Sequence, residues 1–513
     1  MAKISNYVQI YSLSFSYDMS PALVVGIIAA YFLLLIFISW LTSRGESDNK
    51  TFFTANRQSP WYLVAFGMIG ASLSGVTFIS IPGEVGASFF SYFQVVLGYI
   101  IGYAVIGLVL LPLYYRLNLV SIYGYLEERF GFWSYKTGAV FFLISRLIGS
   151  SFRLYLAANV LQIAVFDAWG VPFIVTVAVT ILLIWLYTFK GGIKTIVFTD
   201  TLQTLFMLLA VGISIYLIGQ ELGMGVSELV GAVEESRFSQ IFFFDDVNSP
   251  NYFWKQFISG AFIAIVMTGL DQDMMQKNLT VRTLGDAQKN MFWFTIVLVI
   301  ANLVFLTLGA MLYIYVEAKG IALPERSDSL YPMLALNNFP KLAGIMFLLG
   351  IIAAAYSSAD SALTALTTSF CVDILGFEKR TQEEGKQRTR LMVHIAFSII
   401  TLIVIVVFNA MNDKSVINQV FRAAGYTYGP LLGLFTFGLL TRRAIRDSWA
   451  PVVCILAPVI SFILDYNSVQ WFGGFKFGFF ILLLNGALML VGLWLISLGA
   501  GRKMEVAGAY NSR

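Results

Sequence analysis

Apolar runs long enough to cross a lipid bilayer recur along almost the whole chain, separated by short polar stretches. Crossing about 30 Å of hydrocarbon takes roughly 20 residues of helix. Thirteen segments approach this length, at 22–41, 61–81, 93–115, 138–166, 171–187, 197–219, 256–271, 291–316, 341–370, 391–410, 417–440, 448–465 and 477–500. Backbone amides in lipid must be paired within the protein, and barrel strands would be about 10 residues long with alternating polarity. The pattern predicts an all-α integral membrane protein with thirteen transmembrane helices.

The charges that flank these segments predict an orientation. An odd number of helices places the termini on opposite sides, and cytoplasmic loops carry an excess of Lys and Arg. Most of the 33 Lys and Arg residues fall in cytoplasmic loops if the N-terminus is outside and the C-terminus is cytoplasmic. The run 22–41 is longer than the roughly 7–15 apolar residues of a signal peptide, so we interpret it as a retained helix. We expect a multi-pass protein of the cell membrane.

Composition narrows the function classes. Hydrophobic residues make up 58% of the chain and charged residues 12%, so the lipid bilayer is its expected solvent and nucleic acid is not an expected partner. Cys371, Cys454 and His394 cannot build a disulfide framework, a thiolate cluster or a His-rich metal site. Neither H-E-x-x-H nor G-x-S-x-G occurs, which argues against an enzyme. No obligatory protein partner is inferred.

The second segment is interrupted by small and hydroxyl residues. The run Gly70–Thr77 is followed by Pro82, a pattern typical of a broken helix. Unwinding there would free backbone carbonyls near the membrane midplane, where discontinuous transporter helices coordinate ions. The alternative is close packing of the small residues against a neighbouring helix.

The ninth segment carries an oxygen-rich stripe. Ser357, Asp360, Ser361 and Thr364 recur at spacings of three and four, which places them on one helical face. Sodium, a hard cation, prefers several oxygen ligands, and hydroxyls with one carboxylate supply them. Serines alone often hydrogen-bond only to the preceding turn, so packing remains the alternative.

Three more charged residues lie inside apolar segments. Asp200 follows a diglycine loop by about two turns and could bind a cation or complement the positive end of its helix. Arg146 and Arg153 are seven residues apart, two turns along one face of the fourth segment. Either could hold a substrate carboxylate or phosphate, or pair with an acidic residue of the bundle.

Six groups of residues together carry a family resemblance: Ser72–Pro82, Tyr123–Phe130, Tyr187–Ile193 with Thr199–Gln203, Asp271–Gln272 with Gln276–Lys277, Ala354–Ser361 and Gly429–Phe435. In this order, and on segments found independently from hydropathy, they resemble the sodium:solute symporter family. That family includes sodium/glucose, sodium/proline and sodium/sialic acid symporters with a LeuT-type inverted repeat. The resemblance covers nearly the whole chain and implies one transporter domain, 1–513. Within it, two five-helix inverted repeats would span 61–219 and 256–440, with a leading helix at 22–41 and trailing helices at 448–500.

The resemblance also implies ion sites. The general sodium site of the family maps to the carbonyls of Gly70, Leu73, Ala354 and Ser357 and the hydroxyl of Ser358. A second cation site, known in only some members, maps to Asp200, Ser357, Asp360 and Ser361. Asp360 is a departure, because aligned members carry a hydroxyl residue there. The two carboxylates could strengthen cation binding or share a proton.

The implied substrate site is less specific. It maps to Ser72, Ser74, Thr77, Tyr92 and Thr268. The arginine that clamps the sialic acid carboxylate in sialic acid symporters falls on Gly149, and Arg146 lies one turn earlier on the same face. An organic anion and a neutral sugar or polyol both remain open.

We therefore expect a secondary active symporter that couples inward sodium flow to uptake of a small organic solute, with Na+ as its coupling ion. The alternatives on the same bundle are a proton-coupled symporter, a solute sensor and a passive channel.

Overall fold

The computed structural model describes residues 21–42, 55–188, 192–377, 385–411, 415–498 and 500. Within these ranges the regular elements are all helices, and the only β pairing is an isolated bridge between Ser59 and Val281. The all-α prediction is confirmed for this part of the chain. Both chain ends, on which the predicted sidedness depends, lie outside the described residues.

Nine helices in the described part are long and apolar enough to cross a membrane. They are α1 (Pro21–Thr42), α5 with α6 (Tyr92–Val105 and Leu111–Arg116), α8 (Phe132–Leu161, continued to Trp169), α10 (Gly192–Leu222), α14 (Leu284–Lys319), α16 (Lys341–Ser369, continued to Ile374), α17 (Lys386–Met411), α20 (Ala450–Tyr466) and α22 (Ile481–Ser497). Two bent pairs raise the count to eleven. The shorter helices α9 (Phe173–Thr188) and α19 (Gly429–Leu440) occupy the remaining predicted segments, and the total of thirteen spans stays a prediction.

Both bent pairs change direction at a short non-helical break. The first joins α3 (Trp61–Ser72) to a stretch that begins at Val76 and includes α4 (Ile81–Ser88), with a bend of 59°. The second joins α12 (Phe253–Ala264, continued to Gly269) to α13 (Gln272–Asn278), with a bend of 68°. The first break falls inside the run Gly70–Thr77, where the sequence predicts it.

A third interruption divides the predicted segment 417–440. The chain bends at Tyr428, between α18 (Val416–Thr427) and α19, although the Tyr428 amide and carbonyl still make helical hydrogen bonds to Ala424 and Leu432. Pro430 lies in the first turn of α19, where its missing N–H costs no hydrogen bond. The expectation of one continuous helix here is wrong.

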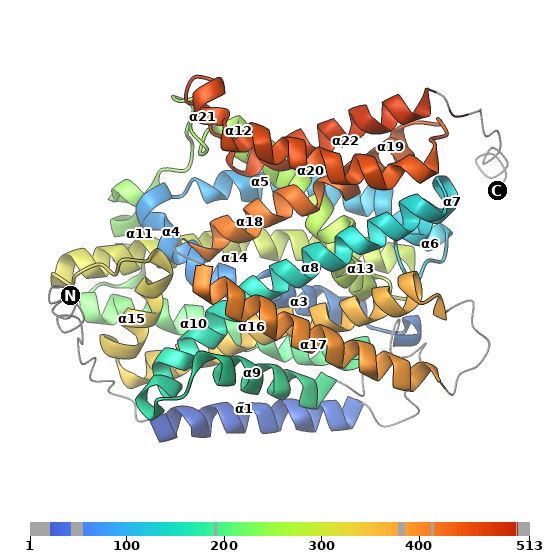
Figure 1. Cartoon of the computed structure of the whole chain (residues 1–513). Coiled ribbons are helices and arrows are strands. Elements are labelled where there is room, and N and C mark those ends of the chain that lie inside the picture. The colour runs from blue at the N-terminus through green and yellow to red at the C-terminus, as the bar shows by residue number, and fades with distance from the viewer. Residues whose placement is uncertain are drawn as a thin grey trace, which may run out of the picture.

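The centre of the bundle is formed by α16 and α10, which run between α1 and α9 on one side and α20 and α22 on the other (Figure 1). Every residue from Gly350 to Ser369 on α16 is buried, as expected for a helix packed on all sides. At the periphery, Leu33 of α1 and Ile455 of α20 are more than half exposed, because their surroundings in a membrane are lipid.

Small residues let α3 lie unusually close to α10. A Cβ on Gly70 would stand 2.2 Å from Thr204 Oγ1, a separation that no real contact tolerates. The Thr204 hydroxyl also donates to the carbonyl oxygen of Phe66 at 3.0 Å. The run Gly70–Thr77 therefore does both things: it contains the helix break, and at Gly70 it packs closely against a neighbouring helix.

Candidate functional site

A cavity of about 70 Å³ lies in the middle of the bundle, beside the break between α3 and α4. Its walls come from α3, α4, α5, α8, α12, α13, α14 and α18. All six residues predicted to bind substrate line it: Ser72, Ser74, Thr77, Tyr92, Arg146 and Thr268. The fold thus brings together side chains that are up to 196 residues apart in sequence, from 72 to 268.

A second cavity, of about 360 Å³, adjoins the first. Both are lined by Ile81, Tyr92 and Ile417, so these three side chains stand where the two spaces meet. The second cavity reaches Pro250 and Phe479, in loops at one end of the bundle. The central cavity is therefore separated from that end by the second cavity and these three side chains.

The break in α3 exposes backbone oxygens beside α16. The last hydrogen bond of α3 runs from the Leu73 amide to the Ile69 carbonyl, at 2.7 Å. The four carbonyls after Ile69 thus lack an intrahelical partner, as at any helix C-terminus. The Ser358 hydroxyl approaches one of them, Ala71 O, at 3.4 Å. The predicted sodium ligands Gly70, Leu73 and Ser358 are therefore drawn from two segments that meet.

Gly75 allows the chain at this break to lie close to two neighbouring helices. A Cβ there would lie 3.3 Å from the backbone oxygen of Arg153 on α8 and 3.3 Å from the side chain of Ile351 on α16. The glycine lets the unwound chain pass between α8 and α16 in close contact with both.

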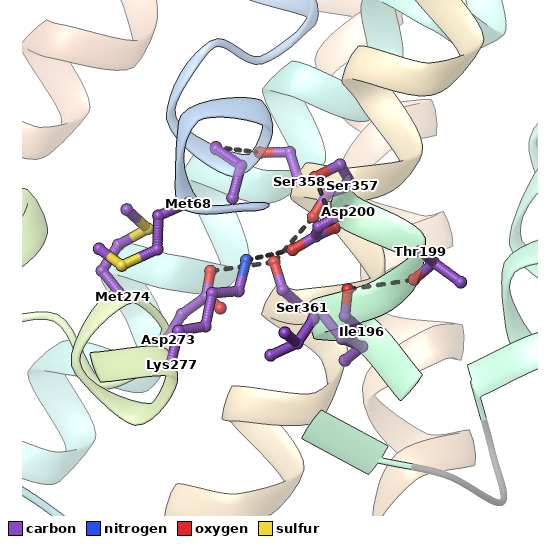
Figure 2. Close-up of polar contacts among 12 residues, drawn as sticks. Met68, Ile196, Thr199, Asp200, Asp273, Met274, Lys277, Ser357, Ser358 and Ser361 are labelled. Atoms are coloured by element: carbon purple, nitrogen blue, oxygen red, sulfur yellow. Dashed lines mark hydrogen bonds and ion pairs between the residues drawn. The ribbon is translucent and has the colours of Figure 1, made fainter. Parts of the chain in front are cut away.

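Asp200 lies in the third turn of α10, well past the helix N-terminus, so it does not complement the positive end of that helix. Its carboxylate is fully buried and joins three helices (Figure 2). Lys277 Nζ of α13 lies 2.7 Å from Asp200 Oδ2, and the Ser357 hydroxyl of α16 donates to Oδ1 at 2.6 Å. Two members of the predicted second cation site therefore meet, but an ammonium group already neutralises their carboxylate.

The other two members, Asp360 and Ser361, lie on α16 with Ser357. The Ser361 hydroxyl donates to Asp273 Oδ2 at 3.3 Å and to the Ser357 carbonyl at 2.8 Å. Asp360 is fully buried on the same helix. Ser361 therefore stays in contact with Ser357 and also faces a carboxylate of α13 that the sequence did not single out.

A second buried ionic cluster forms where α12 gives way to α13. Asp271 caps α13 by accepting from the Asp273 and Met274 amides, at 2.9 and 3.3 Å. Arg146 of α8 pairs with Asp273 and lies 3.9 Å from Asp271. The Tyr428 hydroxyl, at the α18–α19 break, donates to Asp271. Arg146 lines the cavity as predicted, but its charge is balanced by acidic residues of the bundle.

Arg153 has a different environment. It lines the same cavity, and its Nη1 donates to the Ser358 hydroxyl at 3.4 Å. Within the described part of the chain, no carboxylate lies within ion-pairing distance of it, and its buried Nε has no hydrogen-bond partner. Arg153 is therefore a cation without an ion-paired carboxylate among the described residues.

The charges of α13 were not predicted as site residues. Every residue from Gln272 to Asn278 is buried, although the run holds Asp273 and Lys277. Ionisable residues directly after an apolar segment are rare unless paired or functional, and this was the available signal.

The known proteins that this chain resembles are membrane transporters. A model of the sodium:solute symporter family matches residues 52–447. The sodium/sialic acid symporter of Proteus mirabilis is 23% identical over 461 residues, which cover 86% of this chain and 88% of that protein. Sodium-coupled monocarboxylate transporter 1 of Xenopus laevis is 27% identical over 455 residues, covering 84% and 68%. A solved Na+-coupled sialic acid symporter, in a substrate-bound outward-open state, superposes with a TM-score of 0.79 at 19% identity over 93% of this chain and 98% of that one.

Proposed function

Because the chain belongs to the sodium:solute symporter family, we propose that it couples the inward flow of sodium to the uptake of a small organic solute by alternating access. It is a multi-pass membrane transporter, and the solute is a sugar, a sialic acid or another organic anion. The relatives named above carry sialic acid and monocarboxylates according to their names, which supports this range of solutes.

The observation that carries the proposal is the meeting of the α3 break with Ser358. Sodium would be bound by the carbonyls of Gly70, Leu73, Ala354 and Ser357 and the hydroxyl of Ser358. The Gly70 and Leu73 carbonyls, left without helical partners, and the buried Ser358 hydroxyl are oxygen ligands that suit a hard monovalent cation, whereas Ala354 and Ser357 lie inside the helix α16. As a co-substrate, the ion would bind directly beside the cavity that receives the solute.

The second cation site at Asp200, Ser357, Asp360 and Ser361 is a separate proposal. A sodium ion there would have to share the Asp200 carboxylate with Lys277, which lies 2.7 Å away. We therefore assign the first site to the coupling ion, and treat the second as a position where Lys277 supplies the positive charge.

The fold details follow the same reasoning. We propose that the two bent pairs, α3–α4 and α12–α13, are equivalent first helices of two inverted repeats, 61–219 and 256–440. The helix 22–41 would precede them and 448–500 would follow, which gives thirteen spans with the N-terminus outside. The cavity that reaches Pro250 and Phe479 would then open to the outside.

Sodium binding from outside would stabilise the solute-competent arrangement of the α3 break. The coupling is reciprocal, because sodium and solute must raise each other's affinity by the same factor, typically worth about 1–3 kcal/mol. Each charge that crosses a membrane potential of 100 mV contributes about 2.3 kcal/mol, which drives concentrative uptake.

The test is a thermal-shift screen of the purified protein against sugars, sialic acids, monocarboxylates and amino acids, each in sodium and in potassium. A bound solute raises the melting temperature by mass action, so a shift that requires sodium identifies a coupled solute. Uptake of that solute into proteoliposomes should then need an inward sodium gradient. Equal shifts in both salts would favour proton coupling or a sensor instead.

A further inference from the structure

The charged side chains that line the central cavity are all positive. Two arginines, Arg146 and Arg153, line it, and no Asp or Glu is found among the described residues of its walls. The remaining polar groups are hydroxyls and one amide, from side chains such as Thr77, Tyr92 and Asn302. The cavity is thus built to receive negative charge, provided that at least one arginine is not already neutralised.

Arg146 does not meet that condition. Asp273 and Asp271 lie beside its guanidinium on α13, and Arg146 is only 4% exposed. These carboxylates come from outside the cavity wall and hold the guanidinium toward α13.

Arg153 meets it. The guanidinium reaches the cavity two turns further along α8, and its single hydrogen bond to another side chain, to Ser358, is long at 3.4 Å. A partly buried guanidinium whose Nε has no partner favours a carboxylate, which it can bind through two parallel hydrogen bonds.

The partner of Arg153 is also the hydroxyl that the proposed sodium site uses. A sodium ion at Ser358 needs the hydroxyl oxygen and repels a neighbouring guanidinium. Two like charges a few Å apart inside a protein repel by more than the energy of a tenfold change in affinity. Sodium at Ser358 and the observed position of Arg153 therefore disfavour each other.

We propose that Arg153 is the substrate-binding arginine, that the substrate is a small organic carboxylate, and that sodium at Ser358 releases Arg153 to bind it. This rests on the proposed function. Without sodium, Arg153 donates a hydrogen bond to Ser358. With sodium bound, the guanidinium turns into the cavity, where the substrate carboxylate neutralises it. The carboxylate in turn removes the repulsion that opposes sodium, so the two ligands bind cooperatively.

The first test needs no identified substrate. Sodium is titrated against the melting temperature of the purified protein at constant ionic strength, with choline as the replacement cation. Arg153→Gln should bind sodium at least about tenfold more tightly than wild type, because the opposing charge is gone. Arg153→Lys should stay near wild type. Arg237→Gln, which removes an exposed arginine paired with Glu317, is the control for loss of a positive charge and should not alter sodium affinity.

The second test uses matched anionic and neutral probes: pyruvate with pyruvamide, and N-acetylneuraminate with N-acetylmannosamine. In sodium, at least one carboxylate should stabilise the wild type while its neutral partner does not. Arg153→Gln should lose this response, and Arg153→Lys should keep part of it. In wild type the carboxylate should also tighten sodium binding, and in Arg153→Gln this coupling should be absent.

The outcomes separate the two proposals. If sodium fails to stabilise the wild type, the sodium site and with it the proposed function fall, and the role of Arg153 falls with them. If sodium stabilises the wild type but Arg153→Gln leaves sodium affinity unchanged, the proposed function stands and the release of Arg153 is refuted. Neutral probes that bind as well as carboxylates, or no response to either carboxylate, overturn the anion assignment alone.

Discussion

Replacing Lys277 by methionine should destabilise the protein severely, because it leaves the Asp200 carboxylate buried without a counter-charge. The two side chains are 1% and 0% exposed, and Nζ lies 2.7 Å from Oδ2. Removing one partner of such a pair typically costs about 3–5 kcal/mol. Methionine keeps the length of the side chain, so the loss reports the charge and not a cavity.

The assay is the melting temperature in detergent without sodium, for Lys277→Met, Asp200→Asn and the double variant. Each single change should lower it strongly, and the double variant should recover most of the loss, because neither charge is then left unpaired. Lys289→Met is the matched control. Lys289 is 64% exposed and lies 3.5 Å from Asp286, and such exposed pairs contribute at most about 1 kcal/mol.

The same variants test the second cation site. If Asp200 and Ser357 can hold sodium once Lys277 is gone, sodium should stabilise Lys277→Met more than wild type and should not rescue the double variant. An unchanged melting temperature for Lys277→Met in both salts would refute the reasoning, since Asp200 would then need no counter-charge. If Lys277→Met loses stability and sodium does not restore it, the role of the ion pair is supported and the second cation site is refuted.

Two further predictions concern single side chains. Ser358→Ala should weaken sodium binding by about tenfold or more, because a polar group that binds a charge contributes roughly 1.5–3 kcal/mol. The melting temperature in potassium should stay unchanged, because the hydroxyl makes only 3.4 Å contacts. A sodium titration of Ser358→Ala that matches wild type would contradict the site. Asp328, in the loop before α15 (Leu330–Asn337), accepts from the Val416 amide at 2.9 Å, and burial raises the pKa of its carboxyl above the usual value of about 3.9. The protonated form is thus favoured in the folded state, so wild type should lose stability relative to Asp328→Asn as pH rises from about 4, and parallel melting curves across pH would refute this.

Hydropathy located the helices because lipid imposes a strong and local constraint on sequence. It also predicted the α3 break, since Gly70–Thr77 interrupts an apolar run. The bend at Tyr428 was missed, because 417–440 as a whole has the length of one membrane span and only Gly429 and Pro430 signal the bend. Contacts between residues on different helices could not be predicted from the local sequence pattern. Nothing near Asp200 in sequence indicates that Lys277, 77 residues later, neutralises it.

The same limit decides how the two arginines of α8 should be tested. The sequence places Arg146 and Arg153 on one face, and both line the cavity, so position alone cannot rank them. Removing Arg146 leaves Asp273 and Asp271 buried without compensation, so Arg146→Ala should destabilise the protein by about 3–5 kcal/mol whatever the substrate is.

Loss of transport in Arg146→Ala would therefore say little about substrate contact. The informative variant is Arg146→Met combined with Asp273→Asn, which removes the paired charges together. If Arg146 mainly holds α13 to α8, this variant should regain a wild-type melting temperature and keep sodium-dependent binding of carboxylates. If it is stable but binds no carboxylate while Arg153→Gln still does, the anion contact belongs to Arg146, and the assignment of Arg153 would have to be withdrawn.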